Sequence, residues 1–159
     1  MNHYFKYTFF LLAVVVLFTN CDNQEPETQG SFTTKLSNFT HSDCKNNMKK
    51  SSDNRESIVL KTVNSNELKV NHNNTVFNCC PGELTAKLKI SGDTIFIDEN
   101  ESENYCNCMC PYDFEFYIEE LKFDTYIFVI RKYNLEHFKF TFNFTATTDT
   151  VIVFDENMQ

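Results

Sequence analysis

Apolar and polar residues alternate with a period of two over much of the chain after residue 56. An apolar or aromatic side chain occupies every second position in segments 84–90, 112–119 and 138–144. Because successive side chains of a β-strand point to opposite faces, each segment is predicted to form a half-buried strand. Between the first of them and Ile95, Ser91-Gly92-Asp93 supplies a turn, so a β-hairpin is expected there.

Further strands are predicted from short β-branched and aromatic runs at 57–63, 68–72, 75–78, 125–132 and 150–154. After residue 56 we find no capped run with helical period. About seven or eight short strands at intervals of about 8 to 12 residues indicate an all-β protein, an antiparallel β-sandwich. The four phenylalanines of 138–144 are interpreted as core residues, with an exposed ligand platform as the alternative.

One local pattern refines the predicted fold. In Leu121-Lys122-Phe123-Asp124-Thr125-Tyr126, the tyrosine precedes the apolar run 127–130. This resembles the tyrosine corner of immunoglobulin-like sandwiches, although Phe123-Asp124 replaces the usual Pro-Gly. We therefore predict an immunoglobulin-like sandwich with Tyr126 at its corner; an ordinary hairpin tyrosine is the alternative.

The N-terminus has the layout of a secretory signal. Lys6 precedes an apolar run of about eleven residues, 8–18, which is shorter than the roughly 20 residues of a membrane-spanning helix. We predict a signal peptide at 1–20. The cysteine that follows, Cys21, resembles the lipobox cysteine of bacterial lipoproteins, although residues 18–20 depart from the common pattern. Lipid attachment at Cys21 is expected, with ordinary cleavage and a soluble product as the alternative.

Residues 21–56 are predicted to form a lipid-anchored flexible linker, because they are rich in Asn, Ser, Thr and charged residues and lack a sustained apolar period. Phe32, Leu36 and Phe39 could form a brief turn or an added strand, but a weakly ordered segment is expected. The acidic residues after Cys21 are reminiscent of surface-export signals, or form a solvated spacer. The β-sandwich domain is placed at 57–155 and a C-terminal tail at 156–159.

Six cysteines remain after Cys21, and they are predicted to form three disulfides. They are Cys44, Cys79, Cys80, Cys106, Cys108 and Cys110. Six cysteines allow 15 connectivities, and bridges are the usual state in an oxidising envelope. The last three share one face of an extended strand at spacings of roughly 6.5 to 7 Å, too wide for easy mutual pairing. We expect Cys79 and Cys80 to pair with two of these three, and Cys44 with the third.

Metal binding is the alternative use of these sulfurs. A soft tetrahedral site for zinc or copper would draw on Cys79, Cys80, Cys106, Cys108, Cys110 and His72. The C-C and C-x-C-x-C spacings differ from those of structural zinc sites, so no metal and no cofactor are expected. A dithiol oxidoreductase is disfavoured, because neither C-x-x-C nor a βαβ pattern is present.

The run VNHNNTVFNCCPGEL, followed by CNCMCPYDFEFYI, resembles a group of uncharacterised cysteine-rich lipoproteins from Bacteroidetes-type bacteria. The resemblance covers roughly residues 72–130. It implies a secreted or lipid-anchored β domain with internal bridges, and it implies no activity. Some relatives carry a cysteine in the first strand, where this chain has Ser57.

Charge and missing motifs limit the function further. The predicted leader contains one of the 14 Lys and Arg residues, which leaves 13 against 22 Asp and Glu, a net charge of −9. Nucleic-acid binding is therefore disfavoured. No catalytic constellation is found, and with three glycines a phosphate-binding loop is not expected. The sequence favours a non-catalytic, lipid-anchored module of the cell envelope that binds a protein or glycan partner; a metal-binding lipoprotein is the alternative.

Overall fold

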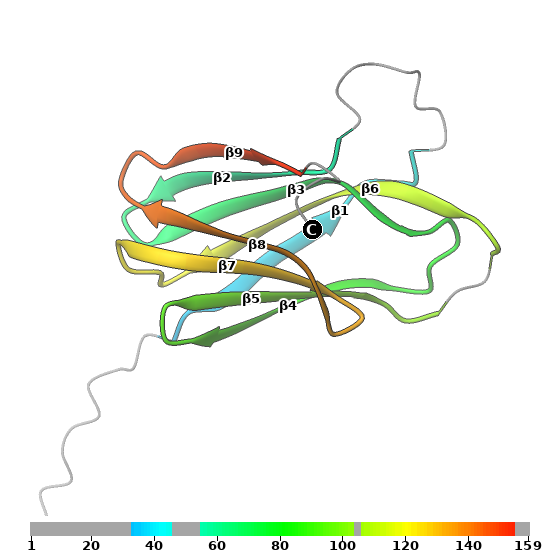
Figure 1. Ribbon diagram of the computed structural model, residues 1–159, viewed down its shortest axis with the longest axis horizontal. Helices are drawn as coiled ribbons and strands as arrows, with labels where there is room; N and C mark the ends of the chain where they lie inside the picture. The colour runs from blue at the N-terminus through cyan, green and yellow to red at the C-terminus, as the bar shows by residue number, and fades with distance from the viewer. Residues whose placement is uncertain (1–32, 46–54, 104–105, 155–159) are drawn as a thin grey trace, which may run out of the picture. The chain divides into compact units, whose positions relative to one another are not determined.

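The computed structural model describes residues 33–45, 55–103 and 106–154, and these form nine β-strands (Figure 1). The predicted signal peptide and Cys21 lie outside these residues. The strands are β1 (Lys35–His41), β2 (Ser57–Asn64), β3 (Glu67–Asn78), β4 (Leu84–Ser91), β5 (Thr94–Glu101), β6 (Met109–Glu119), β7 (Asp124–Lys132), β8 (Leu135–Phe144) and β9 (Asp149–Val153). The described ranges contain no helix long and apolar enough to cross a lipid bilayer. The predicted all-β fold is confirmed.

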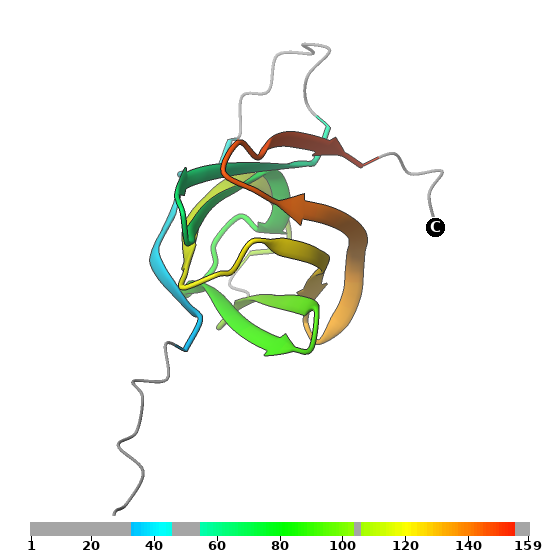
Figure 2. The ribbon, with the colours of Figure 1, turned by 90° about the vertical axis from the view of Figure 1, so that its left-hand side faces the viewer.

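The strands form two packed sheets. One has five strands in the order β1-β6-β3-β2-β9, and the other has four in the order β4-β5-β7-β8. Figure 2 shows the two layers facing each other, with β8 and β9 adjacent in the chain but in different sheets. The predicted disulfide-stapled sandwich is therefore confirmed, with nine strands where seven or eight were expected.

One neighbouring pair of strands departs from the expected antiparallel arrangement. β5 and β7 run parallel, with Phe96 opposite Val129, while every other pair in the described sheets is antiparallel. The cause is topological: between β5 and β7 the chain crosses to the other sheet as β6 and returns, so its direction reverses twice. Whether the sandwich is immunoglobulin-like stays a prediction.

The prediction of a flexible linker over residues 21–56 is wrong for β1. This strand pairs antiparallel with β6, with Leu36 opposite Ile118, and belongs to the same compact unit as the other eight strands. Leu36 and Phe39 pack against the core. Two apolar side chains on one face supplied too weak a signal by themselves, but the adjoining edge of β6 supplies backbone partners and an apolar surface.

The two strands predicted at 68–72 and 75–78 are one long strand, β3, with an irregularity. The register against β6 shifts between His72 and Thr75, where Asn74 has a φ of 58°. Asparagine tolerates this left-handed region better than most residues. The backbone N–H of Asn74 donates to Oδ1 of Asp113 at 3.0 Å, and the side-chain NH₂ of Asn74 donates to the Arg55 carbonyl at 3.1 Å. The shift therefore bends the strand without breaking the sheet.

The main core lies between the sheets. It contains side chains from both layers, among them Ile58, Leu60, Leu68, Val70, Ile95, Ile97, Phe116, Ile118, Phe128 and Ile130. The predicted phenylalanine stripe of β8 belongs to it, with two members buried and two partly buried against it. Full burial of one such side chain stabilises the fold by about 1.5–3 kcal/mol. The interpretation of the stripe as core is confirmed.

Two tight turns set the register of the four-stranded sheet. In the predicted β4–β5 hairpin, Ser91 pairs with Thr94 across Gly92-Asp93, and Gly92 has a φ of 61°. A positive φ at the first of two loop residues is typical of a type II′ turn. In the β7–β8 hairpin, Tyr133 and Asn134 have φ values of 52° and 65°, as in a type I′ turn.

Candidate functional site

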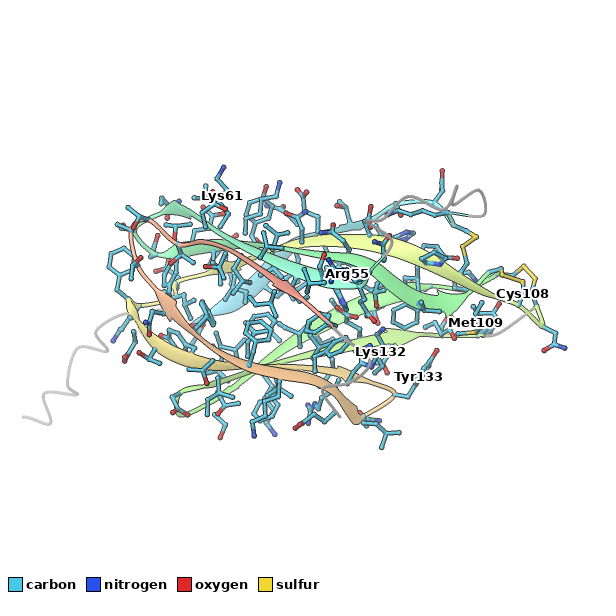
Figure 3. The ribbon with its side chains drawn as sticks, turned by 45° about the horizontal axis from the view of Figure 1, so that its top comes forward. Arg55, Lys61, Cys108, Met109, Lys132 and Tyr133 are labelled. Atoms are coloured by element: carbon cyan, nitrogen blue, oxygen red, sulfur yellow. A yellow bond between two sulfur atoms is a disulfide. The ribbon has the colours of Figure 1, made fainter. Side chains whose placement is uncertain are left out.

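Three disulfides gather at one end of the sandwich, at the end of β3 and the start of β6. They join Cys44 to Cys110, Cys79 to Cys108 and Cys80 to Cys106, with Cα–Cα distances of 5.6, 5.6 and 5.4 Å. Figure 3 shows the sulfur atoms at the end where Cys108 and Met109 are labelled. Cys79 and Cys80 each pair with one of the three cysteines at 106, 108 and 110, and Cys44 pairs with the remaining one, as the sequence predicted.

A second apolar cluster lies beneath the bridges. Its buried members are Phe77, Leu84, Cys110, Tyr112 and Phe114, with Phe39, Cys44 and Cys79 packed against them. The Phe77 and Phe114 rings stack with centroids 5.3 Å apart, and Phe39 meets Phe114 edge to face at 5.2 Å. The bridge from Cys44 to Cys110 therefore belongs to a packed core, whereas Cys108 is exposed.

Asn78 organises the backbone around the bridges, a role that the sequence analysis missed. Its backbone N–H donates to the Glu101 carboxylate at 2.9 Å. Its side-chain NH₂ donates to the Cys106 carbonyl at 2.6 Å, and its side-chain oxygen accepts from the backbone N–H of Cys80 at 2.8 Å. Its carbonyl accepts from the Tyr112 hydroxyl at 2.9 Å. Since the residue is only 5% exposed, these bonds satisfy groups that burial would otherwise penalise. An asparagine directly before Cys79-Cys80 was the only sequence signal.

The cysteines of the alternative metal site are not present as thiolates. All five of its cysteines are bridged, and a disulfide sulfur is not the thiolate that binds zinc. The sixth candidate, His72, contacts Glu99 and Glu56. Within the described ranges, no group of three or more His, Cys, Asp or Glu side chains is arranged to hold a metal ion.

A buried polar cluster, which we call the inter-sheet cluster, connects the two layers. It consists of Glu56, His72, Glu99, Lys132 and His137, from five different places in the chain. His72 and Glu99 are completely buried, and Nδ1 of His72 lies 2.7 Å from Oε1 of Glu99. Lys132 donates to Glu56 at 2.8 Å, and Nε2 of His137 contacts both oxygens of Glu56 at 3.1 Å.

The second nitrogen of His72 also faces a carboxylate. Nε2 lies 2.8 Å from Oε1 of Glu56, but the approach does not have the geometry of a hydrogen bond, so we treat the contact as an ion pair. The other oxygen of Glu99 accepts from the Thr75 hydroxyl at 3.3 Å. The cluster therefore links β3 and the chain before β2, in one sheet, to β5, β7 and β8 in the other.

The pKa values of Glu56 and His72 are shifted in opposite directions, and each shift favours the charged form of its side chain. Burial by itself lowers the pKa of His72, but the charge of Glu99 and the contacts with Glu56 and Glu99 outweigh it and raise that pKa above its ordinary value. Burial alone raises the pKa of Glu56, but contacts with His137 and His72 and the charge of Lys132 lower it well below its usual range. The lowered pKa favours the ionised form of Glu56, so its contacts with His72, His137 and Lys132 form an ionic link between the sheets.

The outer face of the four-stranded sheet presents lysines. Lys89 lies opposite Phe96, Phe96 opposite Val129, and Val129 opposite Lys139, which forms one row across four strands. Lys87 lies in the next row, which continues through Asp98, Arg131 and Glu136, and in this row Arg131 forms an ion pair with Asp98. We call Lys87, Lys89 and Lys139 the lysine face; all three are exposed, and none forms an ion pair with another described residue.

A shallow open hollow of about 440 Å³ adjoins this face between the edge strands β1 and β4. It is lined by Thr34, Lys35, Leu36, Ala86, Lys87 and Leu88. None of the residues that the sequence analysis assigned to a site lines it. Three of the lining residues are apolar and two are lysines, and the position of the hollow depends on two strands that are far apart in the chain.

Tyr126 makes the backbone contact expected of a corner tyrosine. Its hydroxyl donates to the Lys122 carbonyl at 3.1 Å, four residues upstream. Its ring packs against the main core.

Comparison of the chain with protein-family models, curated proteins and solved structures finds no match. The function of the protein is therefore inferred from the geometry of the chain itself.

Proposed function

We propose that this chain is an exported, lipid-anchored protein of the cell envelope that binds a partner and catalyses no reaction. The observation that carries the proposal is the bridging of all six cysteines that follow Cys21. Stable structural disulfides form in oxidising compartments and are rare in the cytosol. The apolar leader supplies a route to such a compartment, and Cys21 supplies a site of lipid attachment.

The resemblance of residues 72–130 to cysteine-rich lipoproteins agrees with this location. The metal-binding alternative has less support, because its thiols would have to remain reduced in the same compartment. A catalytic role has little support from the inter-sheet cluster, whose carboxylates are engaged by His72, His137 and Lys132.

The anchor is tested by fractionation of cells that express the full chain or the Cys21→Ser variant. We expect the wild type in the membrane fraction, labelled by radioactive palmitate, because acyl chains hold it there. The variant is expected to lose both the label and membrane retention. Wild-type protein that accumulates in the cytosol with an uncut leader and six reduced thiols would contradict the proposal, as would palmitate labelling that persists without Cys21.

The surface proposed for partner binding is the lysine face together with the adjoining hollow. Its lysines form a cationic area on a chain with a net charge of −8. The local positive potential attracts an anionic ligand, although the protein as a whole is negatively charged. Lys89 and Lys139 lie on the outer strands of the sheet, roughly 14 Å apart across three strand spacings. This separation suits an extended ligand with repeating negative charges.

An acidic glycan fits this surface better than an acidic protein. Protein interfaces have cores rich in aromatic residues and poor in lysine. Here the lysines flank Phe96, whose ring is covered by the Arg131 guanidinium at 4.8 Å. The neighbouring row, Ser91, Thr94, Ile127 and Thr141, contributes hydroxyl groups. Such a shallow and cationic face suits a hydrated polysaccharide with carboxylate groups.

Binding is tested with an immobilised polyuronic acid, with neutral dextran as the reference. The double charge reversal Lys89→Glu with Lys139→Glu is expected to weaken binding by about tenfold or more, since each exposed charge contact contributes about 0.2–1 kcal/mol and reversal replaces attraction by repulsion. Raising the salt concentration should weaken the wild type in the same direction.

The matched control is Lys61→Glu with Lys122→Glu, which changes net charge equally at two exposed lysines outside the lysine face. Figure 3 labels Lys61 at the end of the molecule away from Cys108. Equal losses in both double variants would show that net charge alone matters and would contradict the assignment. Equal binding to polyglutamate would point to an acidic peptide and contradict the choice of a glycan.

A further inference from the structure

The two sheets leave four edge strands, β1, β4, β8 and β9, and the last differs from the other three. Exposed edges usually carry charges or irregularities that prevent another strand from pairing with them. β1 has Lys35 and a register shift at Asn38, β4 has Lys87 and Lys89, and β8 has Glu136 and Lys139. β9 has one charged residue, Asp149 at its first position, and from Thr150 to Val153 it has no charge, no proline and no register shift against its neighbour.

The inner side of β9 is firmly held. Five residues pair antiparallel with β2, from Asp149 opposite Lys61 to Val153 opposite Ser57. Ile152 packs against the main core, and the Phe154 ring stacks on Phe138. The strand is therefore ordered before any partner arrives, which removes much of the entropic cost of adding a strand.

Within the described residues, the outer side of β9 has no strand beside it. No other strand of the described sheets pairs with it, so a row of backbone N–H and C=O groups faces outward. Val151 is 59% exposed on the outer face of the sheet. Uncharged, β-branched residues with free backbone groups are the features that favour strand addition.

We propose that β9 pairs antiparallel with β9 of a second copy of this chain, which joins two five-stranded sheets into one across a two-fold axis at Val151. In this register Val151 lies opposite its own copy, Thr150 opposite Ile152, and Asp149 opposite Val153. The strand is self-complementary, as a two-fold interface requires, and the two Asp149 side chains do not oppose each other.

The small contact area and the net charge of the chain determine how strong this dimer is and how it responds to salt. A contact through five residues is small beside the roughly 1,200–2,000 Å² of a standard stable interface, so a weak and reversible dimer is expected. Each copy has a net charge of −8, and the two copies repel each other. Salt screens this repulsion, so the dimer tightens as ionic strength rises, opposite to the expected response of the lysine face. The proposal is independent of any glycan.

Sedimentation equilibrium of the folded, oxidised chain carrying Cys21→Ser tests the dimer at increasing protein concentration. The variant Val151→Lys places two lysines opposite each other at the two-fold axis and is expected to weaken the dimer by at least about tenfold. The control Val63→Lys changes another exposed valine of the same sheet, 51% exposed on β2, and should alter the dimer constant less than about twofold.

Oxidative cross-linking tests the register. Directly opposed residues of an antiparallel pair have Cβ atoms about 4.5–5.5 Å apart, close enough for a disulfide after a small adjustment. Val151→Cys is therefore expected to form a covalent dimer, and Val63→Cys is not. A wild type that stays monomeric at every concentration would overturn the proposal, as would a dimer that Val151→Lys leaves unchanged or that Val63→Lys weakens equally.

Discussion

Replacing Cys44 and Cys110 together by alanine is expected to lower the free energy of unfolding by about 4 kcal/mol. Their bridge closes the longest loop of the three, with a sequence separation of 66, and loop-closure entropy grows with loop length. Cys110 is 1% exposed within the second apolar cluster, so alanine avoids placing a hydroxyl group there. Urea unfolding of the oxidised proteins, followed by circular dichroism, measures the change.

The control is the pair Cys80→Ala with Cys106→Ala, whose bridge spans 26 residues and joins two half-buried cysteines. Its loss should cost less, by roughly 1 kcal/mol from the loop-length term. The Cys44–Cys110 bridge also fixes the end of β1 to β6, so amide exchange in β1 should accelerate only when that bridge is removed. Equal costs and unchanged exchange would show that the bridge does not hold β1.

Replacing His72 by leucine is expected to lower the free energy of unfolding by about 3–5 kcal/mol, because the change leaves Glu99 fully buried without its cation. Removing both members in His72→Leu with Glu99→Leu should cost clearly less than the sum of the single changes, since no unpaired charge remains. Additive losses would indicate that the two residues contribute through packing alone.

The pH dependence of the same variants gives a second readout. The raised pKa of His72 stabilises the fold below its unfolded value of about 6.5, and that stability is lost as pH rises through the folded pKa. The lowered pKa of Glu56 stabilises above its unfolded value of about 4.3, and that stability is lost as pH falls through the folded pKa. The wild type should therefore melt at a higher temperature at pH 5.5 than at pH 8.5, and His72→Leu should show a smaller difference.

The inter-sheet cluster shows why some site residues escaped sequence reasoning. Glu56 lies at the boundary of a polar segment, Glu99 lies in an acidic run, and His137 and Lys132 flank a hairpin. Each of these residues has the local context of a solvated surface side chain, and a solvated role is the usual one for such types. Only the packing of one sheet on the other brings these residues together and shields them, in part or completely, from water, which makes their pairing favourable.

The cysteines illustrate the opposite case. A vicinal pair can offer its two side chains in different directions, and three cysteines at alternate positions share one face. These local constraints predicted that Cys79 and Cys80 would each take a partner among Cys106, Cys108 and Cys110. Which sulfur joined which depended on the antiparallel register of β3 with β6, where Phe77 lies opposite Cys110 and Asn78 opposite Met109.

The amino-acid sequence by itself determined the all-β class, most strand positions, the Gly92-Asp93 hairpin and the identity of the core stripe, because these follow from side-chain periodicity and turn chemistry within a few neighbouring residues. The tertiary structure decided the recruitment of β1, the parallel placement of β5 beside β7, the exposed edge of β9 and the ionic cluster around His72. Each of these depends on contacts between segments that are distant in the chain, and the energy of such contacts exists only when both sheets have packed.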